Sequence, residues 1–304
     1  MIYTITFNPS VDYVMETSDF KEGSLNRSQN TYKFAGGKGI NVSRILNSLG
    51  VKSVAYGFIG GFTGSFIKKV LKEEGISTNF VELEQDSRIN VKLKGIKETE
   101  INASGPFVSN EDFKALCDEI NQINKGDIVI VSGSVPPSLS KNVYSDIAKI
   151  VKNKCANLVV DAEKDLLLST LEYQPLLIKP NLNELEEIFN TSISTEEEVI
   201  KYGRKLIEKG ARSIIVSLGA DGAIYLDNDY ILKATVPKGS VVNTIGAGDS
   251  TVAGMIAGIA NKKGIKTSFK LAIASGSATA FSKDLATGTK IESLINDINI
   301  NFLD

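Results

Sequence analysis

The regular alternation of short apolar runs with amphipathic segments in the second half of the sequence constrains its fold more than any other feature. Compact, mostly apolar runs occur at 127–134, 157–163, 176–181 and 213–219. Segments with helical periodicity alternate with them at 109–124, 140–154, 181–190 and 195–210. Runs that are apolar throughout indicate strands buried on both faces. Such strands in alternation with helices predict a mostly parallel sheet covered by helices on both sides.

The first half follows this pattern less regularly and adds a second, smaller sheet. We expect strands at 2–7, 53–60 and 78–83, and helices at 40–49 and 64–75. Residues 88–104 instead alternate polar and apolar side chains, which is typical of a hairpin exposed on one face. Together with the alternating residues 12–34, they predict a small β-sheet lid.

The end of the chain completes one domain. Residues 222–236 read as a hairpin, and three helices are expected after it. No Pro/Ser-rich linker divides the chain, and we find no internal repeat. The sequence therefore predicts a single doubly wound α/β domain over residues 1–304, with a lid formed by about 12–34 and 88–104.

Composition excludes several functional classes. The sequence contains no histidine, which excludes Ser-His-Asp triads, histidine bases and histidine metal ligands. The formal net charge is -2 and no basic tract is present, so we expect no nucleic-acid partner. The opening MIYTITF does not resemble a signal peptide, no apolar run is long enough to span a bilayer, and the two cysteines form no C-x-x-C pair. We therefore expect a cytoplasmic protein with no membrane partner.

Polar clusters follow several of the expected strands. They are NPSVD at 8–12, SGS at 132–134, KPNLNE at 179–184, SLGADG at 217–222 and TIGAGDSTVAG at 244–254. In an open parallel sheet, ligands bind at the carboxyl ends of the strands. We therefore expect these clusters to converge on one ligand site.

The cluster at 244–254 is a glycine-rich turn that leads into a helix of small residues. It lacks the lysine of a P-loop and the third glycine of a dinucleotide-binding fingerprint. Gly246 and Gly248 let backbone amides converge on an anion at a helix N-terminus. Asp249 would repel a permanently bound phosphate, but it suits a base that accepts a hydroxyl proton during phosphoryl transfer. The alternative interpretation is an ordinary helix cap formed by Asp249.

A second glycine-rich cluster, AGGKGIN, covers residues 35–41. Gly36 and Gly37 allow the backbone to approach a polar ligand, and Asn41 could bind sugar hydroxyls from the first helical turn. Asp12 could bind a pair of hydroxyls or only complete a local turn. Either cluster alone is weak, because most glycine-rich loops before helices are simple turns.

These two clusters, in this order and about two hundred residues apart, make the whole chain resemble the ribokinase-like (PfkB) family of sugar kinases. The resemblance implies a three-layer α/β/α sandwich with a mostly parallel central sheet and a β-sheet lid, which often pairs in a homodimer. It implies that Asp249 is the catalytic base. It also implies an anion hole formed by backbone amides at Gly246, Ala247, Gly248 and Asp249.

The resemblance also implies a site for ATP, the co-substrate, and for Mg²⁺. Glu184 of the N-x-x-E element would help to hold Mg²⁺ through water, although on local grounds it is only a helix N-terminal acid. The implied ATP contacts are Lys179, Asn181, Ser217, Gly219, Ala220, Asp221, Gly222 and Gly248. Asn243 replaces an aspartate that helps many family members to bind a monovalent cation, which argues against activation by potassium.

Within the family, TITFNPSVD at 4–12, LNR at 25–27 and SRINVKL at 87–93 look like the phosphosugar kinases. Cations at Arg27, Lys38 and Arg88 would grip the phosphate that the sugar already carries. The other implied substrate contacts are Asp12, Gly36, Gly37, Asn41, Asn90, Lys92 and Ser134. Asn90 and Lys92 are expected to face the same side of their strand as Arg88.

The branch resemblance implies ATP-dependent phosphorylation of fructose 1-phosphate at its 6-hydroxyl, which gives fructose 1,6-bisphosphate. Two other substrates remain open, tagatose 6-phosphate and fructose 6-phosphate. A non-catalytic phosphosugar or nucleotide sensor is the alternative of a different class. A sensor has no use for a base, so the combination of Asp249, the glycine loop and Glu184 favours an enzyme.

Overall fold

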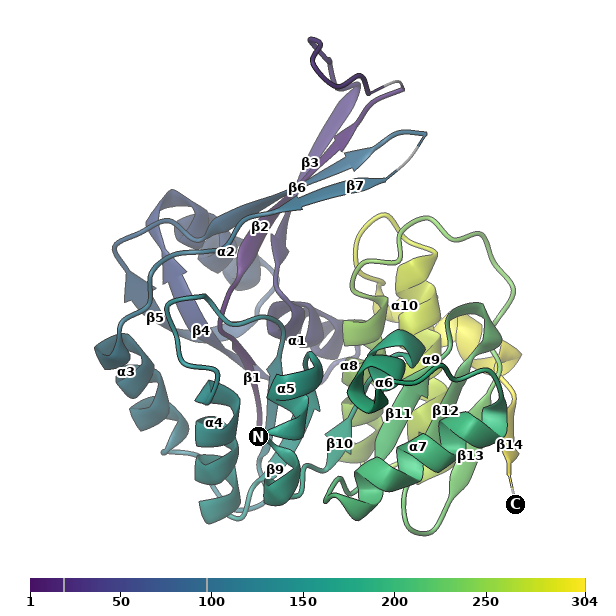
Figure 1. Ribbon diagram of the computed structural model, residues 1–304. Helices are drawn as coiled ribbons and strands as arrows, with labels where there is room; N and C mark the ends of the chain where they lie inside the picture. Colours follow the sequence, from purple (N-terminus) through teal and green to yellow (C-terminus); the bar gives the residue numbers. More distant parts are fainter. Residues whose placement is uncertain (19, 97, 304) are drawn as a thin grey trace.

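The computed structural model describes residues 1–18, 20–96 and 98–303; residues 19 and 97, inside the two predicted lid segments, and residue 304 lie outside this description. Ten strands form the large sheet in the order β14-β13-β12-β11-β10-β9-β8-β1-β4-β5 (Figure 1). They are β1 (Ile2–Thr6), β4 (Val54–Gly60), β5 (Ser77–Leu83), β8 (Ile128–Ser132), β9 (Asn157–Asp161), β10 (Leu177–Ile178), β11 (Ile214–Ser217), β12 (Ala223–Leu226), β13 (Ile231–Ala234) and β14 (Ile300–Phe302).

In this sheet, β5, β4, β1, β8, β9, β10 and β11 pair in parallel, whereas β11, β12, β13 and β14 pair in antiparallel fashion. The helices are α1 (Lys38–Ser48), α2 (Gly61–Glu73), α3 (Asn110–Ile120), α4 (Val143–Asn153), α5 (Lys164–Leu168), α6 (Leu182–Phe189), α7 (Glu196–Glu208), α8 (Ala247–Ala260), α9 (Ile265–Ala280) and α10 (Gly288–Leu294). Short 3₁₀ turns lie at Leu171–Tyr173, Gly219–Asp221 and Ile295–Asp297.

The central strands bury side chains on both faces, which explains why their sequences are apolar throughout. In β8, Val129 and Val131 belong to a core shared with α3, α4 and α7. The alternate residues, Ile128 and Ile130, belong to a second core shared with α1, α8 and α9. The helices thus cover both faces of the sheet, and the predicted three-layer α/β/α sandwich is confirmed.

The lid is a separate four-stranded sheet in the order β3-β2-β6-β7. Its strands are β2 (Ser10–Glu16), β3 (Asn30–Gly36), β6 (Arg88–Lys94) and β7 (Thr99–Asn102), and it rises from one end of the molecule (Figure 1). Strand β2 follows β1 after a short turn, so the lid begins directly at the carboxyl end of a central strand. Val11 and Ala35 pack with Ile67 and Leu71 of α2, which fixes the base of the lid to the main domain.

Two elements differ from the expectations. Strand β14 pairs with β13 at the edge of the sheet, and helix α5 follows β9; neither was predicted from the sequence. Both are short, and β14 has only three residues, too few for a recognisable periodicity. Among the residues that the structure describes, no helix is both long and apolar enough to cross a membrane.

Candidate active site

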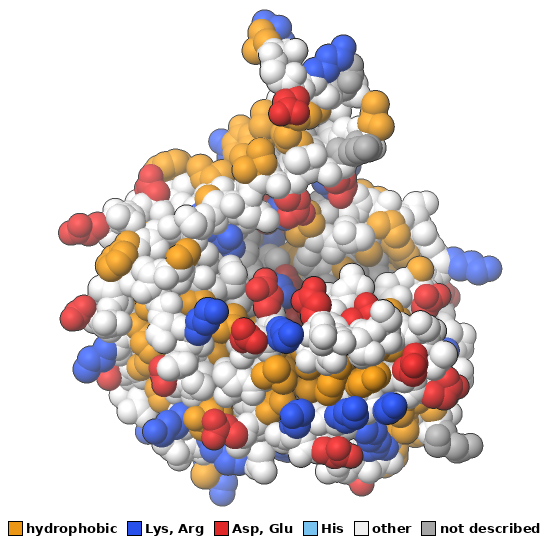
Figure 2. Space-filling model, in the orientation of Figure 1, with side chains coloured by type: hydrophobic (Ala, Val, Ile, Leu, Met, Phe, Trp, Pro, Cys, Tyr) orange, Lys and Arg blue, Asp and Glu red, His pale blue; other side chains and the backbone are white. Residues whose placement is uncertain are grey.

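A polar cavity of about 610 Å³ lies between the lid and the carboxyl ends of the central strands, where the space-filling view shows a hollow (Figure 2). Every polar cluster of the sequence contributes to it. Its lining residues are Thr6, Asn8, Ser10, Asp12, Gly37, Lys38, Asn41, Arg88, Asn90, Lys92, Glu100, Asn102, Gly133, Ser134, Asp161, Glu163, Lys179, Asn181, Glu184, Ser217, Ile245, Gly246, Gly248 and Asp249. The fold therefore brings most of the predicted site residues together.

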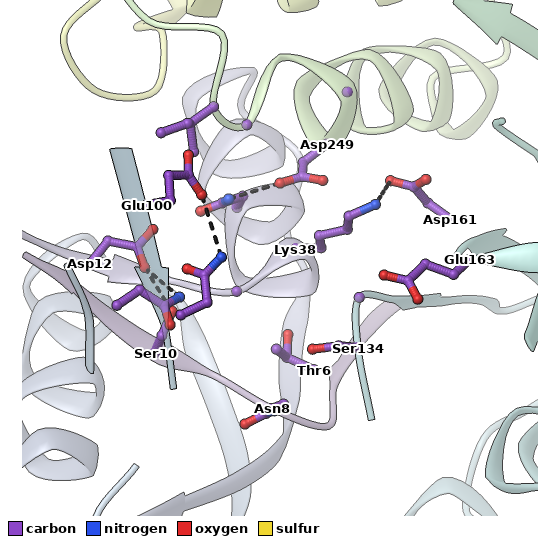
Figure 3. Close-up of a pocket in the computed structure, with 18 of the residues that line it drawn as sticks. Thr6, Asn8, Ser10, Asp12, Lys38, Glu100, Ser134, Asp161, Glu163 and Asp249 are labelled. Carbon is purple, nitrogen blue, oxygen red and sulfur yellow. Dashed lines mark hydrogen bonds and ion pairs between the residues drawn. The ribbon is translucent and has the colours of Figure 1, made fainter. Parts of the chain in front are cut away.

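Asp249 lies in the first turn of α8 and is 5% exposed. Gly246, with φ of 77°, is the residue at the helix cap, and the Asp249 side chain accepts a hydrogen bond from Asn41 Nδ2 at 2.8 Å instead of capping the helix (Figure 3). The capping interpretation of Asp249 is therefore wrong. Burial, followed by the nearby charge of Asp161, raises the pKa of Asp249 to about 6, although Lys38, Asn41 and Lys179 act in the opposite direction. A carboxyl group with this pKa is suited to proton transfer near neutral pH.

The amides at the start of α8 are not all equivalent. The N–H of Ala247 donates to the carbonyl of Thr244 at 3.2 Å, and Ala247 is not among the described residues that line the cavity. The first N–H groups of a helix have no acceptor within the helix. The amides of Gly248 and Asp249 are therefore better placed for an anion than that of Ala247.

Asp161, at the end of β9, joins two lysines across the cavity. Its Oδ2 lies 3.3 Å from Lys38 Nζ (Figure 3), and its Oδ1 lies 3.4 Å from Lys179 Nζ. Burial alone would raise the pKa of Asp161, but the charges of Lys179 and Lys38 more than offset this and lower it. Asp161 in turn raises the pKa of Lys38, which stays protonated. Our sequence analysis did not select Asp161, although it is a polar residue at the end of an apolar run, as are the clusters that were selected.

The inner face of the lid carries a second charged group. Asp12 accepts hydrogen bonds from Ser10 Oγ at 2.8 Å and from Asn90 Nδ2 at 3.2 Å, and its Oδ2 lies 3.3 Å from Lys92 Nζ. A Cβ atom on Gly36 would lie 2.6 Å from the Asp12 carboxyl carbon, so only glycine leaves room for this carboxylate.

Arg88, at the start of β6, lines the same cavity wall as Asn90 and Lys92, as expected from their alternate positions. It donates from Nε to the carbonyl of Asn8 and from Nη1 to the carbonyl of Ala103, each at 3.1 Å. These bonds hold the guanidinium at the rim of the cavity. Burial lowers the pKa of Arg88, and Asp12 partly offsets this effect.

Some predicted contacts are not part of this cavity. Arg27 is exposed in the loop between β2 and β3, and the described lining residues do not include it. The same holds for Gly36, Gly219, Ala220, Asp221 and Gly222. Gly222 has a backbone role, because its φ is 96° and a Cβ there would lie 1.9 Å from the carbonyl oxygen of Ala234.

Glu184 combines the two interpretations that the sequence left open. Its Oε2 accepts from the amide of Asn181 and its own amide donates to Asn181 Oδ1, each at 2.8 Å, which is a capping box at the start of α6. Glu184 also lines the cavity, together with Glu163.

Among the described residues, no group of three or more Cys, Asp or Glu side chains could enclose a metal ion. Mg²⁺ usually keeps several waters and needs only one or two carboxylates, so the residues present fit such an ion.

Several buried polar atoms of the cavity wall lack a hydrogen-bond partner. They include Thr6 Oγ1, Asn8 Oδ1 and Asn90 Oδ1. An unsatisfied buried group typically costs about 1–3 kcal/mol. These atoms are enclosed by protein beside the cavity, with Thr6 Oγ1 close to Gly39 and Asn8 Oδ1 close to Gly105. Thr6 and Asn8 were missed by our sequence analysis, although Asn8 belongs to the NPSVD cluster.

Comparison with known proteins agrees with this geometry. Residues 5–291 match the pfkB family carbohydrate kinase profile. The chain belongs to this family. It is 48% identical to a 1-phosphofructokinase of Bacillus subtilis (100% of both chains) and 38% identical to a D-tagatose-1-phosphate kinase of Bacillus licheniformis (100% of both). A crystal structure from Staphylococcus aureus, provisionally named a phosphofructokinase, is 56% identical with a TM-score of 0.90, and the match covers 100% of this chain and 99% of that one. The expected carbohydrate kinase family is thus confirmed.

Proposed function

We propose that this carbohydrate kinase transfers the γ-phosphoryl group of ATP to the 6-hydroxyl of fructose 1-phosphate and so forms fructose 1,6-bisphosphate. The observation that carries the proposal is the arrangement of one cavity. A buried carboxylate at a helix N-terminus, Asp249, lines this cavity from α8, and the cations Arg88 and Lys92 line it from strand β6 of the lid. The two curated relatives described above support it further, because both are named for a ketohexose that carries its phosphate on carbon 1.

At the reacting end, Asp249 accepts the proton of the attacking hydroxyl. Its raised pKa of about 6 leaves it ionised at neutral pH yet basic enough to take a proton as the new bond forms. The amides of Gly248 and Asp249 donate to the oxygens of the phosphoryl group in transfer, and the N-terminus of α8 favours the same negative charge. Asn41 fixes the carboxylate so that one oxygen remains for the substrate.

At the other end, Arg88 and Lys92 bind the phosphate that the sugar already carries. The carboxylate of Asp12 and the amide of Asn90 bind ring hydroxyls, since both lie on the inner face of the lid beside Lys92. Closure of the lid over the sugar excludes water, which limits hydrolysis of ATP.

On the nucleotide side, Lys179, Asn181 and Ser217 line the cavity next to Glu184. Mg²⁺ held near Glu184 would neutralise charge on the ATP phosphates. Asp161 holds Lys38 and Lys179 at fixed positions between the two substrates. These lysines thus offer positive charge along the line of transfer.

An assay of ADP release tests the proposal. Purified protein with ATP and Mg²⁺ is given fructose 1-phosphate, fructose 6-phosphate, tagatose 1-phosphate or tagatose 6-phosphate, with Asp249→Asn as the matched control. We expect the highest kcat/KM for fructose 1-phosphate and little turnover by the variant. Preference for another phosphosugar would change the assigned substrate but keep the protein a carbohydrate kinase. No turnover with any of them would favour a sensor.

The outer face of the lid supports a homodimer. Its side chains are largely apolar and partly exposed, with Ile89 37% and Ile101 59% exposed, and Tyr13 and Val91 lie beside them in the strand register. A lid-to-lid dimer would cover this face. If Arg27 contacts a phosphosugar, it does so in the partner's cavity, because it does not line its own. Sedimentation of the wild type and of Ile101→Lys tests the dimer, and a monomeric wild type would contradict it.

A further inference from the structure

Arg44 of α1 pairs with two carboxylates, yet it is not among the described residues that line the substrate cavity. Its Nε donates to both carboxylate oxygens of Glu74 at 3.0 Å. Its Nη1 and Nη2 donate to Asp284 Oδ1 and Oδ2 at 3.2 and 2.7 Å. The Arg44 side chain is only 11% exposed. One guanidinium thus joins α1 to the end of α2 and to the segment between α9 and α10.

The segment around Asp284 supports the loop that precedes α8. The carbonyl of Lys283 accepts from Asn243 Nδ2 at 3.2 Å. On the other side of Asp284, the side chain of Leu285 packs against Gly246, where an added Cβ would lie 2.7 Å from Leu285 Cδ2. Residues 283–285 therefore contact both ends of the turn 243–246.

A hydrogen-bonded chain strengthens this support. The amide of Ala286 donates to Thr279 Oγ1 at 3.1 Å, and that hydroxyl lies 2.8 Å from Ser250 Oγ. Ser250 in turn donates to the carbonyl of Gly246 at 2.7 Å. A displacement of residues 284–286 would therefore reach Gly246 both through packing and through hydrogen bonds.

Helix α1 consequently reaches the loop at Asp249 by two routes. Asn41 bonds Asp249 directly, and Arg44, one turn later, grips the segment that supports Gly246. We propose that Arg44, through Asp284, is a positioning residue. It holds the anion-binding turn at 246–249 so that its backbone amides keep their position relative to the Asp249 carboxylate. The inference rests on the proposed role of this turn in phosphoryl transfer. Its expected consequence is selective, because a small misplacement of reacting groups can lower turnover by about 10²-fold while binding contacts remain.

Glu74 provides an internal control, because it pairs with the same guanidinium but lies at the end of α2, away from the turn. Glu74→Gln and Asp284→Asn each remove one carboxylate charge from Arg44. If Arg44 only stabilises the fold, both variants lower the melting temperature and have the same effect on kcat. If Arg44 positions the turn through Asp284, only Asp284→Asn affects turnover.

The test measures kcat, both KM values and the melting temperature on whichever phosphosugar the wild type uses best. We expect Asp284→Asn to lower kcat about tenfold or more with each KM within about twofold, and Glu74→Gln to keep kcat within about twofold. Asp284→Glu, which keeps the charge but lengthens the side chain, should give an intermediate kcat and serves if the asparagine variant does not fold. Equal kcat losses in the Glu74 and Asp284 variants, or an unchanged kcat in Asp284→Asn, would overturn the inference. The wild-type substrate preference tests the proposed function separately.

Discussion

Asn41 Nδ2 donates a hydrogen bond to Asp249 Oδ2 over 2.8 Å, across a sequence separation of 208 residues. Both side chains are buried, and they belong to the two glycine-rich motifs from which the family resemblance arose. The first motif therefore orients the proposed base through Asn41. Both helices begin at the same cavity.

Asp249→Asn should fold and bind ATP but lose turnover. The amide is nearly isosteric and can still interact with Asn41, yet it cannot accept the proton of the attacking hydroxyl. Loss of a general base typically lowers the rate by about 10²–10⁴-fold. Steady-state assays give kcat, and nucleotide titration confirms binding. A variant that keeps more than about a tenth of the wild-type kcat would exclude Asp249 as the base.

The same substitution should stabilise the protein at alkaline pH. Burial and Asp161 raise the folded-state pKa of Asp249 from 3.8 to about 6, so the folded state binds this proton more tightly than the unfolded state does. The resulting stability is fully present below about pH 4 and is lost as pH rises through about 6. At pH 8 the wild type thus holds a buried charge that Asp249→Asn lacks.

Melting curves between pH 4 and 8 check this sign. For a chain of 304 residues, each kcal/mol shifts the melting temperature by roughly 1.5–2 °C. We expect Asp249→Asn to melt above the wild type at pH 8, with the difference shrinking toward pH 4. A variant that melts below the wild type at pH 8 would show that the lysines outweigh burial.

Asn41→Ala should move the acidic limb of the pH–rate profile upward. Asn41 stabilises the ionised form of Asp249, so its removal raises the pKa of Asp249 above about 6. A hydrogen bond to a charged group is worth about 1.5–3 kcal/mol, and one pKa unit corresponds to about 1.4 kcal/mol. The midpoint of kcat/KM against pH should therefore rise by about one unit or more. An unchanged midpoint with reduced kcat would instead assign Asn41 to the sugar.

Arg88→Ala should weaken use of the phosphosugar and leave ATP use nearly unchanged. The two backbone carbonyls that hold Arg88 fix its guanidinium at the cavity rim, and a charged contact to phosphate is worth about 1.5–3 kcal/mol. We expect a loss of roughly ten- to hundredfold in kcat/KM for the sugar. Lys94→Ala is the matched control, since Lys94 is on the same strand but is not among the described lining residues. Equal losses in both variants would point to a damaged lid.

The central fold could be predicted well from the sequence, because strands that are buried on both faces consist almost entirely of apolar residues. Strands such as β8 and β9 are apolar throughout, and their order alternates with helices. Strand β14 has no such apolar run, because its three residues form a strand only through pairing with β13. The lid was predicted from its alternating pattern, since only one of its faces meets the cavity.

The site was predicted less completely, for a different physical reason. Asn41 and Asp249 stand in motifs that are recognisable locally, whereas Asp161 matters only because β9 brings it between Lys38 and Lys179. The Arg44–Asp284 pair likewise exists only after α1 and the segment after α9 have packed together. Charge pairs of this kind depend on tertiary distances, which residue spacing does not contain.

Discrimination among ketohexose phosphates is the most demanding prediction. Fructose and tagatose phosphates that carry the phosphate on the same carbon differ in the orientation of one ring hydroxyl, and one misplaced hydroxyl costs a few kcal/mol at most. The residue proposed to bind the ring hydroxyls is Asp12, whose carboxylate is fixed by Ser10, Asn90 and Lys92. A carboxylate held in this way cannot readily move to follow a displaced hydroxyl. We therefore expect kcat/KM for fructose 1-phosphate to be at least about tenfold above that for tagatose 1-phosphate or tagatose 6-phosphate at one ATP concentration.

Asp12→Ala connects this preference to the lid. If Asp12 reads the ring hydroxyls, the variant should lose activity on fructose 1-phosphate and show a fructose-to-tagatose ratio much closer to one. Arg88→Ala is the comparison, since loss of a phosphate contact should weaken both 1-phosphates alike and leave their ratio unchanged. A wild type that prefers a tagatose phosphate would overturn the substrate assignment and leave the role of Asp249 intact. A wild-type ratio that survives in Asp12→Ala would instead transfer the discrimination to another wall of the cavity, where Asn8 and Ser134 lie.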